Sequence, residues 1–205
     1  KESDAIIARG RCNRDVLLGT SHLFTRDVFC FWEDRGEVRM QLKPHAPGIR
    51  KFSEQALTAK ARTIIKSMRA SKDSGKAVMF YSCIIGSIPG QTATAIKVAD
   101  TFVRSLRERL DQVFIINPAE YFEPGMDGDD LMFMWEQVQR SGLINIWRFQ
   151  SMEDIEASFG LMGLKVPPVW SGKDATFSTG CTKEMRIALD MQRSHPELQI
   201  VGPGP

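Results

Sequence analysis

From residue 77 onward, continuous apolar runs alternate with amphipathic segments. Each run is typical of a strand that is buried on both faces of a sheet, and the four runs are Ala77–Gly86, Gln112–Phe122, Leu143–Phe149 and Leu198–Gly204. The segments between them have the period of helices, at about Thr92–Leu110, at about Asp130–Arg140 and after the polar loop that begins at Ser178. Alternating strands and helices predict a parallel sheet with right-handed crossovers. We therefore expect residues 77–205 to form a Rossmann-like (flavodoxin-like) α/β domain with helices on both faces.

The N-terminal part of the chain has a different pattern. Val28–Leu42 predicts a β-hairpin, because an apolar strand and an alternating strand flank a polar turn with Gly36. After the breaker "KPHAPG", a helix is expected from Ser53, a favourable N-cap residue, to about Ala70. Residues 1–70 are thus predicted to be a small β-rich segment followed by a basic helix. The cations of helix 53–70 suit either a solvated face or a surface for a protein or nucleic-acid partner.

The loops that follow the predicted strands are the places to look for a site. In open parallel sheets, ligands bind beyond the carboxyl ends of the strands. The loops in question are 86–91, 117–130, 150–182 and 202–205. Residues 150–177 contain Pro167-Pro168 and several glycines, and we expect this stretch to be irregular.

Composition and charge narrow the function classes. The chain has 205 residues, of which 42% are hydrophobic, and its formal net charge is +2. A net charge this small does not by itself indicate binding to nucleic acid or to an anionic membrane. The four cysteines and three histidines lack metal-ligand spacing, so no metal is expected. Widely spaced cysteines in apolar runs indicate reduced thiols and a cytoplasmic protein, and no membrane span or signal peptide is visible.

Two loops carry candidate binding groups. The loop Gly86-Ser87-Ile88-Pro89-Gly90-Gln91 joins a predicted buried strand to a helix, whose free N–H groups suit a phosphate. The alternative is a tight turn with ordinary capping. In the second loop, Asp129 and Asp130 belong to a carboxylate cluster that suits ribose hydroxyls, Mg²⁺ or proton transfer. They equally suit the capping of the next helix.

A third candidate is Glu184, which follows the polar loop "STGCTK". We expect it in the first turn of a helix, where the helix dipole favours a carboxylate. However, its loop follows the predicted third strand and the 150–177 stretch, and it should face the same sheet edge as the Gly86 loop. A carboxylate on that edge suits attack on an anomeric carbon, as in retaining glycoside transfer.

Three stretches resemble the nucleoside 2-deoxyribosyltransferase-like superfamily, which includes nucleoside 5′-monophosphate N-glycosidases. They are "VMFYSCIIGSIPGQTATA", "DDLMFMWEQVQRSGLINIWRF" and "STGCTKEMRIALDMQRSHPELQIVGPGP". The resemblance implies that Glu184 is the nucleophile on the sugar C1′ and that Asp129 or Asp130 positions the base or handles its proton. It further implies that phosphate or sugar contacts come from Gly86, Ser87, Gly90, Gln91, Ser178 and Thr179.

The leading expectation is therefore an enzyme that cleaves or exchanges an N-glycosidic bond of a nucleoside or nucleotide without a metal or organic cofactor. One alternative is a non-catalytic nucleotide-sensing or interaction domain of a larger assembly, and another is an NAD glycohydrolase. Tyr121 or Trp170 could stack on a nucleobase, although core packing suits both rings equally. Association into a homo-oligomer is left open. The enzyme hypotheses require that Glu184 reach a pocket, whereas the interaction hypothesis predicts a filled pocket and an apolar patch elsewhere.

Overall fold

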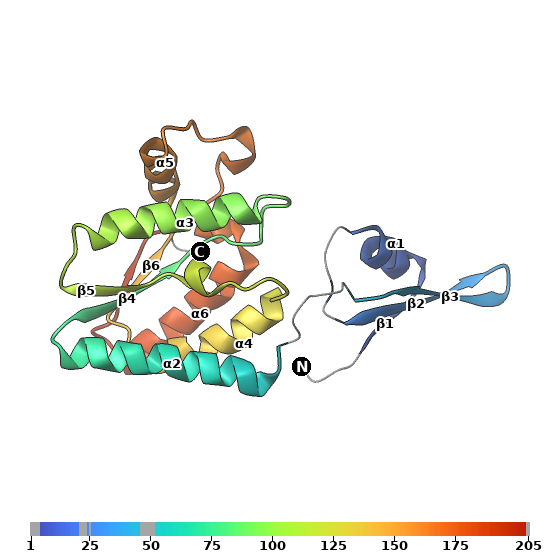
Figure 1. Ribbon diagram of the computed structural model, residues 1–205, viewed down its shortest axis with the longest axis horizontal. Coiled ribbons are helices and arrows are strands. Elements are labelled where there is room, and N and C mark those ends of the chain that lie inside the picture. Colours follow the sequence, from blue (N-terminus) through green and yellow to red (C-terminus); the bar gives the residue numbers. More distant parts are fainter. Residues whose placement is uncertain (1–4, 21–23, 25, 46–51, 204–205) are drawn as a thin grey trace. The chain divides into compact units, whose positions relative to one another are not determined.

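The structure is a computed structural model, and it describes residues 5–20, 24, 26–45 and 52–203 (Figure 1). Its contacts divide the chain into two compact units. The smaller unit combines Lys1–Leu57 with Glu123–Asp130, and the larger unit combines Thr58–Phe122 with Leu131–Pro205.

The larger unit is built on a four-stranded parallel sheet. Its strands are β4 (Ala77–Ser82), β5 (Val113–Ile116), β6 (Ile146–Phe149) and β7 (Gln199–Val201). They lie in the order β5-β4-β6-β7, and every neighbouring pair is parallel. This confirms the predicted α/β fold. Because the chain crosses over β4 on its way from β5 to β6, the order changes direction between β4 and β6, where ligand sites of such sheets lie.

Helices cover both faces of this sheet (Figure 1). One face carries α3 (Thr92–Arg107) and α5 (Met152–Leu161), and there Tyr81 of β4 stacks on Phe102 of α3, with ring centroids 5.4 Å apart. The opposite face carries α2 (Glu54–Asp73), α4 (Gly128–Gln139) and α6 (Thr179–Ser194). Phe80 of β4 points to that face and meets Trp135 and Trp147 edge-on. Successive residues of β4 therefore serve two different cores, as strand geometry requires.

Strand β5 and the stretch 150–177 differ from the expectation. Strand β5 stops at Ile116, six residues before the predicted end, because Pro118–Tyr121 forms a 3₁₀ turn that the Asn117 side chain caps at 3.1 Å from the Ala119 N–H. The stretch 150–177 is not wholly irregular, since it contains α5. Ser151 and Asp154 form a capping box at the start of α5, and this box gives the stretch a defined helix.

Helix α2 begins as expected, because the Ser53 hydroxyl accepts from the Ala56 N–H at 3.2 Å. The helix continues to Asp73, three residues beyond the predicted end. Arg62, Lys66 and Arg69 are exposed along it. Binding of a protein or nucleic-acid partner to these cations stays a prediction.

The smaller unit contains a mixed sheet of three strands. The strands β1 (Ala5–Arg9), β2 (Asp27–Asp34) and β3 (Glu37–Lys43) lie in that order, with β1 parallel and β3 antiparallel to β2. The predicted hairpin is confirmed, and its turn contains Gly36 at a φ of +81°, a left-handed conformation that favours glycine. Strand β1 and helix α1 (Arg11–Gly19) were not predicted.

No helix in the described part of the chain is both long enough and apolar enough to cross a membrane.

Candidate functional site

Glu184 lies in the second turn of α6, so the prediction of a first-turn position is wrong. The helix begins at Thr179, because the Ser178 hydroxyl caps it by accepting from the Cys181 N–H at 3.3 Å. The favourable effect of the helix dipole falls off beyond the first turn. Capping or the dipole therefore does not explain why a carboxylate stands at position 184.

The Glu184 side chain points into the protein and is only 6% exposed. The Nε2 atom of Gln139, near the end of α4, donates a hydrogen bond to Oε1 of Glu184 at 2.8 Å. Burial raises the pKa of Glu184 to about 7, while hydrogen bonding from Ser82 and Gln139 acts in the opposite direction. In the part of the chain that the structure describes, no cationic side chain pairs with Glu184. The carboxyl therefore changes its charge near neutral pH.

Ser82 and Gln139 place this carboxyl at the carboxyl end of the sheet. Ser82 is the last residue of β4, and its hydroxyl also accepts from the Trp147 indole N–H at 2.8 Å. Gln139 lies in the buried stripe of α4 with Trp135 and Val138. Its Oε1 atom is buried and has no hydrogen-bond partner among the described residues. The site thus contains a buried hydrogen-bond acceptor that the described residues leave without a donor.

Sequence reasoning missed both Ser82 and Gln139 as members of the site. A signal for them exists, because each is a polar residue at a position that the apolar period assigns to the core. Buried polar side chains are usually hydrogen-bonded, so two of them on neighbouring elements suggest a shared partner. That partner, Glu184, is on a third element, and no spacing rule connects the three.

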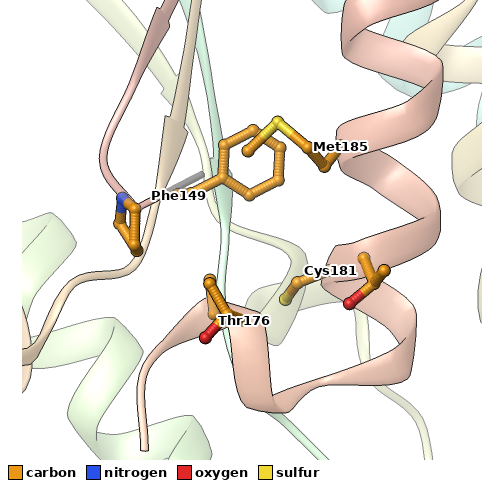
Figure 2. A pocket seen from close by; sticks show the side chains of 7 residues that line it. Phe149, Thr176, Cys181 and Met185 are labelled. Atoms are coloured by element: carbon orange, nitrogen blue, oxygen red, sulfur yellow. The ribbon is translucent and has the colours of Figure 1, made fainter. Parts of the chain in front are cut away.

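A pocket of about 180 Å³ opens beside the first turns of α6 (Figure 2). Figure 2 shows the Met185 side chain reaching toward the Phe149 ring, with Cys181 and Thr176 below them. The full lining is Phe149, Ala175, Thr176, Cys181, Thr182, Met185 and Pro203. Phe149 ends β6 and Pro203 follows β7, so the pocket lies at the carboxyl edge of the sheet. An apolar cavity of about 150 Å³ can hold benzene, so this pocket is large enough for one ring of a ligand.

Glu184 is next to this pocket along the helix but is not part of its lining. Cys181 precedes it by one turn, and Met185 follows it directly. Burial, and then the charge of Glu184, raise the pKa of the Cys181 thiol. The thiol therefore stays protonated at neutral pH and is a poor nucleophile.

The structure brings the Gly86 loop and the start of α6 together, as expected for one sheet edge. The Ser87 hydroxyl donates to the Ser178 hydroxyl at 2.9 Å. Gly86, Gly90 and Thr179 are exposed. Gly90 has a φ of +70°, a conformation that favours glycine just before α3. The Ser87–Ser178 hydrogen bond thus links the two candidate phosphate-binding segments, the Gly86 loop and the start of α6.

Trp170 is fully buried, and its ring meets Phe159 at a centroid distance of 5.8 Å. Its indole N–H donates to Oε1 of Gln91 at 3.2 Å. No face of this ring is open to a nucleobase, so its geometry is that of a core residue. Tyr121 is partly exposed and meets Trp135 edge-on at 5.4 Å. Neither ring lines the pocket of Figure 2.

Asp129 and Asp130 lie in the first turn of α4. Their hydrogen bonds are those of residues at a capped helix start, which was the alternative to a binding or catalytic role. The Asp127 carboxylate accepts from the N–H groups of Asp129 and Asp130 at 2.9 and 2.8 Å. In return, the Asp130 carboxylate accepts from the Asp127 N–H at 3.3 Å. A catalytic role for either acid stays a prediction.

Among the described residues, no three His, Cys, Asp or Glu side chains gather closely enough to hold a metal ion. Function has to be argued from the site itself, since a fold alone does not imply one. Comparison of the chain with models of known protein families, with curated proteins and with solved structures finds no match.

Proposed function

We propose that the larger unit cleaves or transfers an N-glycosidic bond of a nucleoside or nucleotide, with Glu184 acting on the sugar. The observation that carries this proposal is a buried carboxyl at the carboxyl edge of a parallel sheet, held by Gln139 and without a cationic partner among the described residues. A buried carboxyl of this kind costs stability when it ionises, and perturbed groups of this kind cluster at functional sites.

The proposed reaction has two steps. The ionised Glu184 attacks C1′, the C1′–N bond breaks, and the leaving base keeps the bonding electrons and takes up a proton from solvent. Water or a second base then attacks C1′, the bond between C1′ and Glu184 breaks, and the attacking group loses a proton to solvent. The products are the free sugar or a new nucleoside, together with the restored carboxylate. The Gln139 amide orients the attacking group through its 2.8 Å hydrogen bond. Because ionised Glu184 is required, the rate should rise with pH through about 7.

The pocket beside α6 supports a ring-shaped substrate. Its walls are mainly apolar, and the side chains of Thr176 and Thr182 add hydroxyl groups to the lining. Cys181 and Met185, which lie on either side of Glu184 in the sequence of α6, line this space. We place the entry of substrate here, with these two side chains moving aside. The resemblance to deoxyribosyltransferase-like proteins, which implies that Glu184 is the nucleophile, adds support.

Base release measured by mass spectrometry tests the proposal. The protein is incubated with nucleosides, nucleoside monophosphates and NAD in separate reactions, beside Glu184→Gln. Wild type should release a free base from at least one substrate class, and the variant should lower the rate by about a thousandfold or more, as loss of an essential nucleophile does. Release from NAD alone would favour the glycohydrolase alternative.

The matched control is Glu156→Gln, which makes the same change on the exposed side of α5. It should leave base release unchanged. Equal rates for wild type and Glu184→Gln would show that Glu184 performs no chemistry. Absence of release from every substrate would reject the enzyme proposal.

A non-catalytic nucleotide-binding module is the second candidate. The observation that favours it is the closure of the sheet edge by the protein's own contacts, namely the Ser87–Ser178 and Trp170–Gln91 hydrogen bonds. In this case, nucleotides would raise the thermal stability of wild type and Glu184→Gln equally, and no base would appear.

A further inference from the structure

One face of the small sheet in the N-terminal unit is apolar and open. On its inner face, Ala8, Val28 and Cys30 are buried, with α1 residues packed against them. Side chains alternate along a strand, so the outer face carries the other set. The apolar members of that set are Ile7 of β1, Phe29 and Phe31 of β2, and Val38, Met40 and Leu42 of β3, and its charged members are Arg9, Asp27 and Glu33.

Several of these outer side chains are strongly exposed. Val38 is 77% exposed, Met40 is 58% exposed and Leu42 is 43% exposed, all on β3, and Ile7 of β1 is 76% exposed. Contiguous exposed apolar surface marks interaction sites in soluble domains. This surface covers the whole length of β3, so an occupant should lie along that strand.

Strand β3 is also an edge strand. Among the described residues it pairs only with β2, through seven consecutive residues. Every second residue of such an edge points its N–H and C=O groups away from the sheet, where they can pair with another strand. The edge carries no proline, which would interrupt such pairing.

We propose that β3 pairs antiparallel with β3 of a second copy of this chain, with Met40 on the two-fold axis. In this register, Val38 lies opposite Leu42 of the second copy, and each Met40 lies opposite the other. On the inner face, Glu37 lies opposite Lys43, and Arg39 lies opposite Gln41. All seven residues pair, opposite charges meet at both ends, and the apolar outer faces join across the axis.

The neighbouring registers are worse for electrostatic reasons. A shift of two residues in one direction places Arg39 opposite Arg39, and a shift in the other direction places Arg39 opposite Lys43. Like charges directly opposite each other destabilise a sheet. A shift of one residue places apolar side chains opposite polar ones. The strand is therefore self-complementary in one full-length register, which argues for a second copy as the occupant.

The charged ends are compatible with the contacts within one chain. Lys43 donates to the carbonyl oxygens of Leu17 and Thr20 at 3.3 and 2.7 Å, and this holds its amine near the end of α1. Glu37 pairs with Arg39 on the same strand at 2.8 Å. In the dimer, Glu37 would lie near both Arg39 of its own chain and Lys43 of the second copy.

Cysteine cross-linking tests the register. The background is Cys12→Ser, because Cys12 is exposed. Opposed residues of an antiparallel pair have Cα atoms about 4.5–5.5 Å apart, within the range of a disulfide. Met40→Cys should therefore form a disulfide-linked dimer under mild oxidation. Val38→Cys is the matched control, because Val38 is more exposed but would lie about 13 Å from its counterpart, four residues along the strand.

Sedimentation equilibrium of the full chain supplies the second readout. Wild type should dimerise, and Met40→Lys should weaken the dimer about tenfold or more, because two ammonium groups would meet on the axis. Leu161→Lys, an equally exposed apolar residue on α5, should leave the dimer unchanged. A wild-type protein that stays monomeric, a Met40→Lys variant that dimerises as wild type does, or faster cross-linking of Val38→Cys than of Met40→Cys would each overturn the proposal.

Discussion

Asp154 and Glu184 are buried carboxyls that belong to opposite faces of the parallel sheet, and they have different surroundings. On the α5 side, Asp154 is 2% exposed and pairs with Arg148, with Nε 3.2 Å from Oδ2. It also accepts from the Ser151 N–H at 3.3 Å and from the Tyr81 hydroxyl at 3.4 Å. On the α6 side, Glu184 is 6% exposed and accepts from the Gln139 amide.

This difference separates a structural carboxylate from one that suits chemistry. Asp154 has a cation and a capping box, so its charge is part of what holds β6 and α5 together. Glu184 is desolvated without such compensation, and burial raises its pKa to about 7. A fold that needed only a hydrogen-bond acceptor at this position could use a neutral amide. The proposed function gives this carboxyl a use for its charge and its proton.

The largest effect is expected from Asp154→Asn. The substitution leaves Arg148 half-buried without its counter-ion and weakens the capping box of α5. The free energy of unfolding, measured by urea denaturation, should fall by about 4 kcal/mol. Glu156→Gln on the exposed side of the same helix should change it by less than about 0.5 kcal/mol. A small loss in Asp154→Asn would remove the contrast between the two carboxyls.

The next effect is the pH dependence that Glu184 gives to stability. The ordinary pKa of glutamate is 4.5, and that of Glu184 in the folded protein is about 7. Between these values the folded state holds a proton that the unfolded state has lost. The Glu184 contribution to the unfolding free energy therefore falls as pH rises from about 4.5 to 7, by about 3 kcal/mol in total.

Glu184→Gln should remove this fall, because the amide does not titrate and can still accept from Gln139. The variant should match wild type near pH 5 and be more stable than wild type near pH 8, as measured by thermal unfolding at both values. A variant that is less stable than wild type at pH 8 would mean that the Glu184 charge stabilises the fold, as that of Asp154 does.

The smallest effect on the unfolding free energy is expected from loss of the hydrogen bond that links the Gly86 loop to the start of α6. Ser178→Ala removes the N-cap of α6 and the Ser87–Ser178 hydrogen bond, and it should cost about 1 kcal/mol of unfolding free energy. Ser87→Ala removes only the second contact and should cost about 0.5 kcal/mol. Equal costs in the two variants would show that the cap contributes nothing measurable.

The sequence predicted the sheet better than it predicted the site. Apolar runs located all four parallel strands, most clearly β4, in which five of the six residues are buried. They located β7 although Gln199 and Val201 of this strand are exposed. Helix α5 was missed although Ser151 and Asp154 have capping-box spacing, because Gly160, Gly163 and two prolines suggested a loop. Strand β1 was missed for another reason, since its five residues stand alone before a short helix.

The site was predicted only in part, for a physical reason. The sequence predicted that the Gly86 loop and Ser178 lie at one edge of the sheet, because both come after the carboxyl ends of parallel strands. It misplaced Glu184 by one turn, since the cap at Ser178 lies before a glycine and was not recognised. The Gln139 contact depends on how far α4 and α6 approach each other, and packing across three elements is not readable from local pattern.

Titration of the Glu184 carboxyl tests the central claim most directly. Protein labelled with ¹³C at the glutamate side-chain carboxyl is followed by NMR from acid to alkaline pH, and the spectrum of Glu184→Gln identifies the Glu184 resonance. We predict a midpoint near 7, the value expected for a buried carboxyl held by Gln139 and Ser82 without a cation. A midpoint at or below 4.5 would show that the charge of Glu184 is compensated, and the contrast with Asp154 would then fail.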